Sequence, residues 1–141
     1  MTEPQTYANH HRYDPWYHYV AFALALLVLI LPIVRLFRGH GGVWQLAAAL
    51  LLFILLLKVR TYALRVQDRV IRLEETLRLQ ALLGVDLRAR ISELRPAQFV
   101  ALRFAADGEL AARAAEALNE KLGAAEIKKR IQVWRPDTFR V

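Results

Sequence analysis

The chain has 141 residues, no cysteine and a formal net charge of +7 at pH 7. This length allows one small domain beside a membrane anchor, and the lack of cysteine excludes disulfides and thiolate chemistry. Most of the positive charge lies after residue 57, where seventeen of the 20 Lys and Arg residues stand. Such a surface suits anionic lipid or an acidic protein, and we expect no nucleic-acid partner.

Residues 1–15 predict a polar, aromatic-rich arm before the first apolar run. The run over residues 17–34 is long enough to cross a bilayer as a helix. No cleavage site of a signal peptide follows it, so we interpret it as a retained anchor. Pro32 should bend or fray its last turn. Three aromatic residues at its start suit the headgroup region of a membrane: Trp16, Tyr17 and Tyr19.

Three glycines within residues 39–42 break the helix, and the 41 residues that follow, Val43 to Leu83, contain neither glycine nor proline. Residues 43–59 are almost wholly apolar and predict a second span. Residues 60–83 predict an amphipathic helix, the stalk, that continues this span. The residues expected to anchor the second span at the headgroups are Trp44, Lys58 and Arg60.

An apolar stripe with heptad spacing follows the stalk and predicts contact with another helix. Its positions are Leu56, Val59, Ala63, Val66, Val70, Leu73, Leu77 and Gln80. The stalk seam comprises four of them: Val66, Val70, Leu73 and Leu77. Glu74 and Glu75 are expected on the solvated face, with Glu74–Arg78 and Asp68–Arg72 as ordinary i,i+4 pairs.

Basic residues near the spans predict the orientation. Arg12 and five Lys or Arg residues within 58–72 lie on the side of the termini, against Arg35 and Arg38 in the loop. Two spans place both termini on one side, and the excess of basic residues favours the cytoplasm. Neither span has an ionisable residue at its centre, which disfavours a channel or a transporter.

Residues 84–141 predict a small domain of short helices without strands. Asp86 and Asp107 are the expected caps of two of these helices. The expected helices cover residues 87–94, 97–105, 109–122 and 124–134. Apolar residues on them that are candidates for contact with a partner are Phe99, Leu102 and Trp134. With about a dozen sizeable apolar positions the domain is marginal alone. It must therefore be stabilised by contact with the stalk, the membrane surface, a second copy or another protein.

Three motifs stand out along the chain. They are Tyr7-Ala8-Asn9-His10-His11-Arg12-Tyr13, then Ala101-Leu102-Arg103-Phe104-Ala105, then Ile127-Lys128-Lys129-Arg130-Ile131 followed by Trp134-Arg135 and Asp137. Together they resemble a family of small bacterial two-span membrane proteins that carries a domain of unknown function. The resemblance covers nearly the whole chain. It implies an inner-membrane protein and supplies no activity or catalytic residue. Arg95 departs from the pattern, in which a hydroxyl residue is usual before Pro96.

Four residues beside the first span are candidate metal ligands: His10, His11, Asp14 and His18. Adjacent histidines project to different sides of a helix or strand, and no recognised ligand spacing completes the set. We therefore favour an interfacial hydrogen-bonding cluster over a metal or haem site.

A basic run lies on the last expected helix, whose other face is apolar: Lys128, Lys129 and Arg130. Such a helix either lies on anionic lipid headgroups or packs its apolar face into the domain and leaves the charges solvated.

The predicted fold is all-α: a transmembrane hairpin, a stalk that continues the second span, and a small cytoplasmic helical domain. The predicted function is a non-enzymatic accessory, structural or assembly subunit of a larger bacterial inner-membrane complex, such as a respiratory or photosynthetic one. We expect membrane lipids and that complex as partners, with no cofactor and no small-molecule substrate. The alternatives are a self-associating membrane scaffold whose stalks pair, and a small metal- or haem-binding membrane protein that uses the arm histidines.

Overall fold

A computed structural model describes residues 5–10 and 14–137 of the chain. In that part every regular element is a helix, apart from an isolated β-bridge between Ala105 and Trp134. The predicted all-helical class is therefore confirmed. The described residues form two compact units, one of residues 14–65 and one of residues 5–10 together with 66–137.

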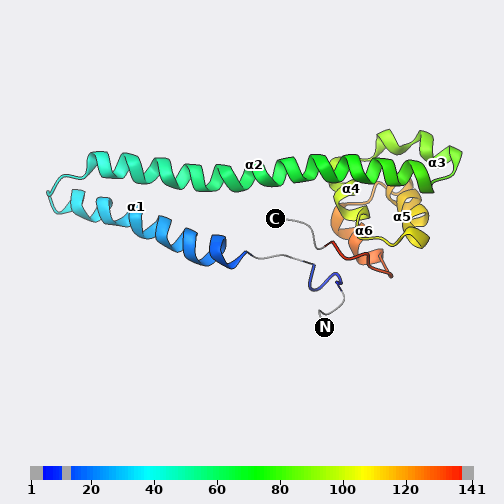
Figure 1. The fold of residues 1–141 in the computed structure, drawn as a ribbon, viewed down its shortest axis with the longest axis horizontal. Helices are drawn as coiled ribbons and strands as arrows, with labels where there is room; N and C mark the ends of the chain where they lie inside the picture. The colour runs from blue at the N-terminus through cyan, green and yellow to red at the C-terminus, as the bar shows by residue number, and fades with distance from the viewer. Residues whose placement is uncertain (1–4, 11–13, 138–141) are drawn as a thin grey trace. The chain divides into compact units, whose positions relative to one another are not determined.

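The first unit contains an apolar helix and the start of a second one. A π-helical segment, Trp16–Ala21, leads into α1 at Phe22–Phe37, and α2 begins at Val43 (Figure 1). The carboxylate of Asp14 caps the first helix, because its Oδ1 accepts the backbone N–H of Trp16 at 3.0 Å. Both helices are long and apolar enough to cross a membrane.

The turn between α1 and α2 requires glycine. Gly42 has φ +123°, and a Cβ there would lie 3.3 Å from the carbonyl oxygen of Pro32. Helix α1 contains Pro32 and continues to Phe37, just before the glycines that the sequence predicts to break the helix. The helix simply runs through the proline, which lies one turn before its last residues.

The π-helical segment and α1 both contact α2 within this unit. The hydroxyl of Tyr17 donates a hydrogen bond of 3.3 Å to the carbonyl of Leu56. Phe22 and Phe53 place their ring centroids 5.8 Å apart. These contacts leave most of the large apolar side chains of both helices exposed.

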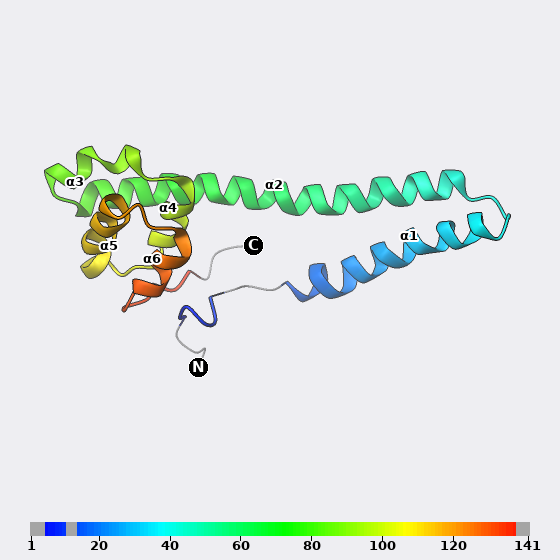
Figure 2. The same ribbon diagram turned by 180° about the vertical axis from the view of Figure 1, so that it is seen from behind.

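The second unit is built on the last part of α2, which ends at Leu82. We call residues 66–137 the C-terminal domain. Helices α4, α5 and α6 lie beside the C-terminal end of α2 in both views (Figures 1 and 2). The elements after α2 are α3 (Val85–Ala89), a 3-10 turn (Ile91–Glu93), α4 (Pro96–Leu102), α5 (Asp107–Asn119) and α6 (Ala124–Arg130).

Both expected caps are wrong by one or two residues. Asp86 and Asp107 lie in the first turns of α3 and α5, where Gly84 and Ala106 take the N-cap positions. A carboxylate in a first turn still stabilises the positive end of the helix. The existence of these helices is therefore predicted correctly and their first residues are not.

The last helix is shorter than predicted. Helix α6 ends at Arg130, and Ile131 has extended backbone angles. Trp134 consequently lies in extended chain, where it pairs with Ala105. Helices α4 and α5 also end earlier than expected, because the chain turns before Ala105 and after Asn119.

The core of the C-terminal domain includes residues of α2. Leu79 and Leu83 are 0% and 2% exposed and join the same buried cluster as Phe99, Leu102 and Leu110. Of the four supports that the sequence left open for this small domain, the structure supplies the stalk. The buried side chains of α2 and of the residue that follows it come in steps of four: Ile71, Glu75 and Leu79 in α2, and Leu83 directly after it.

The guanidinium of Arg78 joins α2 to α5 and pairs with the buried Glu75 of α2. The guanidinium of Arg78 donates to Glu75 at 3.0 Å, to Asp107 at 2.8 Å and to the carbonyl of Ala105 at 2.6 Å. The solvated position expected for Glu75 is wrong, since that residue is 4% exposed. The pair expected between Glu74 and Arg78 is also absent from the described residues, because Arg78 turns toward the domain.

We expect Leu79→Ala to lower the free energy of unfolding of the C-terminal domain by about 2–5 kcal/mol, because it leaves a cavity in the core. Leu82 is 43% exposed, and Leu82→Ala should change this free energy by less than about 0.5 kcal/mol. Urea unfolding of a fragment that begins at Val66 measures both. A fragment of residues 84–141 lacks both core leucines and should not unfold cooperatively. Equal effects of the two substitutions would contradict the assignment of the core.

Candidate functional site

The N-terminal arm packs on the C-terminal domain through His10. Its side chain is 5% exposed. The centroid of its ring lies 5.8 Å from that of Phe104 and 5.8 Å from that of Trp134, and these two rings are 5.1 Å apart. Rings at such distances attract one another beyond the burial of their area. We call these three residues the His10 cluster.

Both ring nitrogens of His10 have partners. Nδ1 lies 2.7 Å from the carbonyl oxygen of Tyr7, and Nε2 lies 3.2 Å from Nζ of Lys128. Since a carbonyl only accepts and an ammonium only donates, Nδ1 carries the proton and Nε2 accepts. The imidazole is neutral in this arrangement, and neither nitrogen points freely toward a metal.

Cations surround the rings of the cluster and of the arm. Nζ of Lys128 lies 5.3 Å from the ring centroid of Phe104, and the guanidinium of Arg103 lies 4.6 Å from it. Nζ of Lys129 lies 5.9 Å from the ring of Tyr7. Such contacts are attractive and strengthen when water is excluded. Lys128 and Lys129 of the basic run thus contact aromatic rings of their own chain.

The chain after α6 ties the arm to α2. The backbone N–H of Asp137 donates to the side-chain oxygen of Gln5 at 2.8 Å, and its carboxylate lies 3.0 Å from Nε of Arg103. Arg135 contacts the carboxylate of Glu75 at 3.2 Å. A cavity of about 280 Å³ lies beside these pairs. Because the charged side chains that line it are of both signs, their charges largely cancel.

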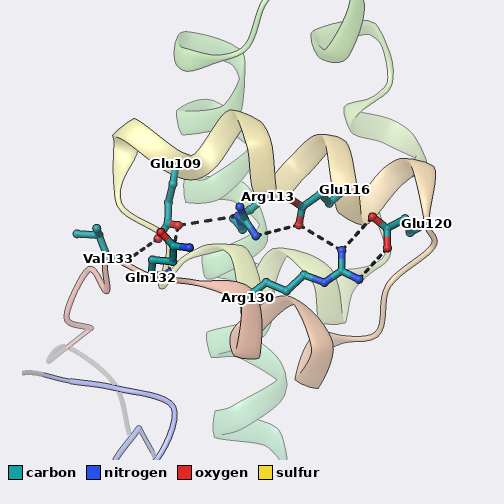
Figure 3. A network of polar contacts seen from close by, with 7 residues as sticks. All are labelled: Glu109, Arg113, Glu116, Glu120, Arg130, Gln132 and Val133. Carbon is teal, nitrogen blue, oxygen red and sulfur yellow. Dashed lines mark hydrogen bonds and ion pairs between the residues drawn. The ribbon is translucent and has the colours of Figure 1, made fainter.

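An ion-pair network holds α6 against α5 (Figure 3). The guanidinium of Arg130 donates to Glu120 at 2.7 Å and 2.9 Å and to Glu116 at 3.3 Å. Arg113 donates to Glu116 at 2.9 Å. The hydrogen bond from Arg130 lowers the pKa of Glu120 below its ordinary value of 4.5.

Glu109, at the start of α5, holds the chain that follows α6 (Figure 3). Its carboxylate accepts the backbone N–H of Val133 at 2.9 Å and that of Gln132 at 3.2 Å. These bonds fix the extended segment that carries Trp134. The opposite face of α6 lies in the core, where Ile127 is 1% exposed. The structure therefore agrees with the second of the two interpretations, in which the apolar face of α6 packs into the domain.

The structure describes three of the four candidate metal ligands. His18 and Asp14 lie in the first unit, where Nδ1 of His18 is 2.8 Å from the backbone oxygen of Asp14. His10 lies in the second unit, and His11 lies outside the described residues. Within residues 5–10 and 14–137 no three His, Asp or Glu side chains gather as a metal site.

The predicted headgroup residues of the first unit have two kinds of surroundings. Lys58 lies 5.9 Å from the ring centroid of Tyr62, and Arg60 lies 5.4 Å from that of Tyr17. The others are exposed side chains at the ends of the apolar helices: Trp16, Tyr19 and Trp44. Contact with lipid stays a prediction for all of them.

The predicted contact residues also divide into two groups. Phe99 and Leu102 are 2% and 0% exposed. They therefore pack within the domain, where another protein does not reach them. Trp134 is half-buried in the His10 cluster. The four residues of the stalk seam are exposed, between 48% and 62%, and remain candidates for contact with another chain.

Segments far apart in the sequence thus meet at one place. Tyr7 and His10 come from the first motif that carries the family resemblance, Phe104 from the second, and Lys128 and Trp134 from the third. Sequence reasoning treated these motifs separately and missed Phe104 as a site residue. The resemblance itself was the only signal that grouped them.

The sequence model described as "Family of unknown function (DUF6526)" matches residues 1–141. The chain belongs to DUF6526. This confirms the predicted membership of a family of unknown function. No curated protein and no solved structure matches the chain. The function of this DUF6526 chain therefore has to be argued from its own residues.

We expect His10→Ala to release the arm of the DUF6526 chain from its domain. The loss of the two ring contacts and of the hydrogen bond with Lys128 should lower the free energy of unfolding by about 1–2 kcal/mol. Hydrogen exchange of the amides of residues 5–10 should become faster. The control is His40→Ala, since His40 is exposed in the turn between α1 and α2. Unchanged exchange in the arm after His10→Ala would contradict the docking.

We expect the Arg130–Glu120 pair to stabilise the DUF6526 chain only while Glu120 is ionised. A carboxyl whose pKa is lower in the folded state adds stability above its unfolded pKa. This stability is lost as the pH falls below 4.5 and through the folded pKa. Glu120→Gln should therefore lower the melting temperature slightly at pH 7, and this difference should shrink as the pH falls below 4.5 and through the folded pKa. Asp68, exposed on α2, supplies the control Asp68→Asn. A difference that persists in acid would argue against the pair.

Proposed function

We propose that this chain is a membrane-anchored, non-enzymatic accessory subunit of a larger bacterial inner-membrane complex. The observation that carries the proposal is the apolar surface of the first unit. Most of the large side chains of α1 and of the first part of α2 are exposed there, among them Leu27, Ile30, Leu51 and Ile54. A continuous apolar surface of this size is rare on a soluble monomer. It suits lipid acyl chains and neighbouring transmembrane helices.

The docking of the arm supports a transmembrane hairpin. Residues 5–10 precede the first apolar helix, whereas the C-terminal domain follows the second one. His10 contacts that domain directly. A chain that crosses a membrane twice has both flanking segments on the same side, as this contact requires. The excess of basic residues beside the arm and the stalk favours the cytoplasmic side.

The spans supply the surface for the partner complex. Ala49 is 3% exposed, so this small residue lies in the contact between the two helices, as such residues do in membranes. Leu52 and Leu55 are 58% and 48% exposed. Because lipid solvates leucine as well as protein does, a partner must gain by shape and packing at these positions. A folded domain of paired charges, positioned at the membrane, is typical of an assembly or structural subunit.

A self-associating scaffold is the second candidate, and the exposed stalk seam favours it. The metal- or haem-binding alternative has less support, since both ring nitrogens of His10 have hydrogen-bond partners in its own chain.

We expect the full-length chain, extracted from a bacterial membrane in mild detergent, to migrate on native gels with a larger complex. The double variant Leu52→Ala, Leu55→Ala should stay in the membrane fraction and leave the complex, because it removes packing at the proposed contact. Leu82→Ala, outside the spans, is the control. Reporters fused to either terminus should be active in the cytoplasm. A chain that migrates alone or only with its own copies, or a C-terminal reporter outside the cell, would overturn this function.

A further inference from the structure

The stalk seam is an apolar stripe that the chain itself leaves uncovered. Val66 and Leu73 are each 62% exposed, Leu77 is 59% exposed and Val70 is 48% exposed. Arginines flank the stripe at Arg65, Arg69 and Arg72. A row of large apolar side chains on an otherwise charged helix costs free energy in water and marks a contact surface.

The C-terminal domain cannot cover this stripe. The domain packs on Ile71, Glu75 and Leu79. At 100° per residue along a helix, the mean direction of these side chains is roughly 170° away from that of the stalk seam. Since the domain occupies the opposite side of α2, no described residue of the domain covers the seam, and its side chains are open to another chain.

The spacing of the seam defines heptad positions. Val70 and Leu77 occupy a positions, whereas Val66 and Leu73 occupy d positions. At the centre of the seam a β-branched residue at a, Val70, is followed by leucine at d, Leu73, the order found in two-stranded parallel coiled coils, whereas Val66 and Leu77 have the reverse types.

The charges beside the seam identify the second strand. Arg69 occupies a g position and Glu74 the following e position, and both are exposed. In a parallel pair in register, each g residue lies next to the e residue five positions further along the other chain. Arg69 of each chain would then face Glu74 of its copy, twice by symmetry. An antiparallel pair brings g next to g and e next to e, which places like charges together.

We propose that the stalk seam is the interface with a second copy of this chain, as a parallel, two-stranded coiled coil in register. Neither Arg69 nor Glu74 forms an ion pair with any residue in the described part of the chain, so both are available to the copy. The parallel orientation rests on the proposed membrane anchoring, because two chains held by the same spans point the same way. Anchoring also raises the effective concentration of the stalks, which a seam of this length needs.

Single cysteines test the interface, because the chain contains no cysteine of its own. Full-length Leu73→Cys and Val66→Cys should form disulfide-linked dimers on mild oxidation in native membranes, since equivalent d residues of a parallel pair lie within disulfide distance. Asp68→Cys, exposed on another face of α2, is the control and should give on the order of tenfold less dimer. Equal cross-linking at the seam and control positions, or none at the seam, would overturn the proposal.

Charge exchange tests the register in the Leu73→Cys background. Arg69→Glu alone and Glu74→Arg alone each place like charges across the interface and should lower the cross-linked fraction severalfold. The double variant Arg69→Glu, Glu74→Arg restores opposite charges and should recover the dimer. No recovery in the double variant would overturn the register. Membrane fractionation of the same cells checks the anchoring separately, so failure of the dimer and failure of the proposed function give different results.

Discussion

The C-terminal domain has a core only because α2 contributes to it. A helical domain of this size buries too little apolar area to be stable alone. Leu79 of α2 and Leu83, directly after α2, complete the buried cluster formed by the later helices. This requirement commits one face of the stalk to the domain and fixes where α4, α5 and α6 lie. It also leaves the opposite face of α2, with the stalk seam, exposed in the part of the chain that the structure describes.

Buried charges fix the position of the domain on that face of α2. Glu75 and Arg78 lie at the edge of the core, with side chains 5% and 12% exposed. Because an unpaired buried charge costs several kcal/mol, each must have complete partners. The carboxylate of Glu75 forms ion pairs with Arg78 and Arg135. Arg78 also donates hydrogen bonds to Asp107 and to the carbonyl of Ala105. The same bonds position the extended segment that carries Trp134, against which His10 packs.

Local patterns predicted the helices well and their packing poorly. Glycines, prolines and apolar spacing gave the order of the elements and both apolar helices. The stalk, however, carries two stripes, and the purely apolar one was easier to see. The stripe that the domain buries contains Glu75, which looks solvated until its two arginines are known. The His10 cluster had no local signal, since His10 and Lys128 are 118 positions apart.

The surfaces of the chain divide in a way that keeps its contacts independent. One face of α2 packs against the C-terminal domain. The N-terminal arm contacts that domain in the later part of its sequence. The exposed leucines at Leu52 and Leu55 and the stalk seam lie at different positions along α2. A partner in the membrane and a second copy along the stalk would therefore not compete for the same residues. Because the two contacts use different side chains, a substitution that removes one of them should leave the other intact.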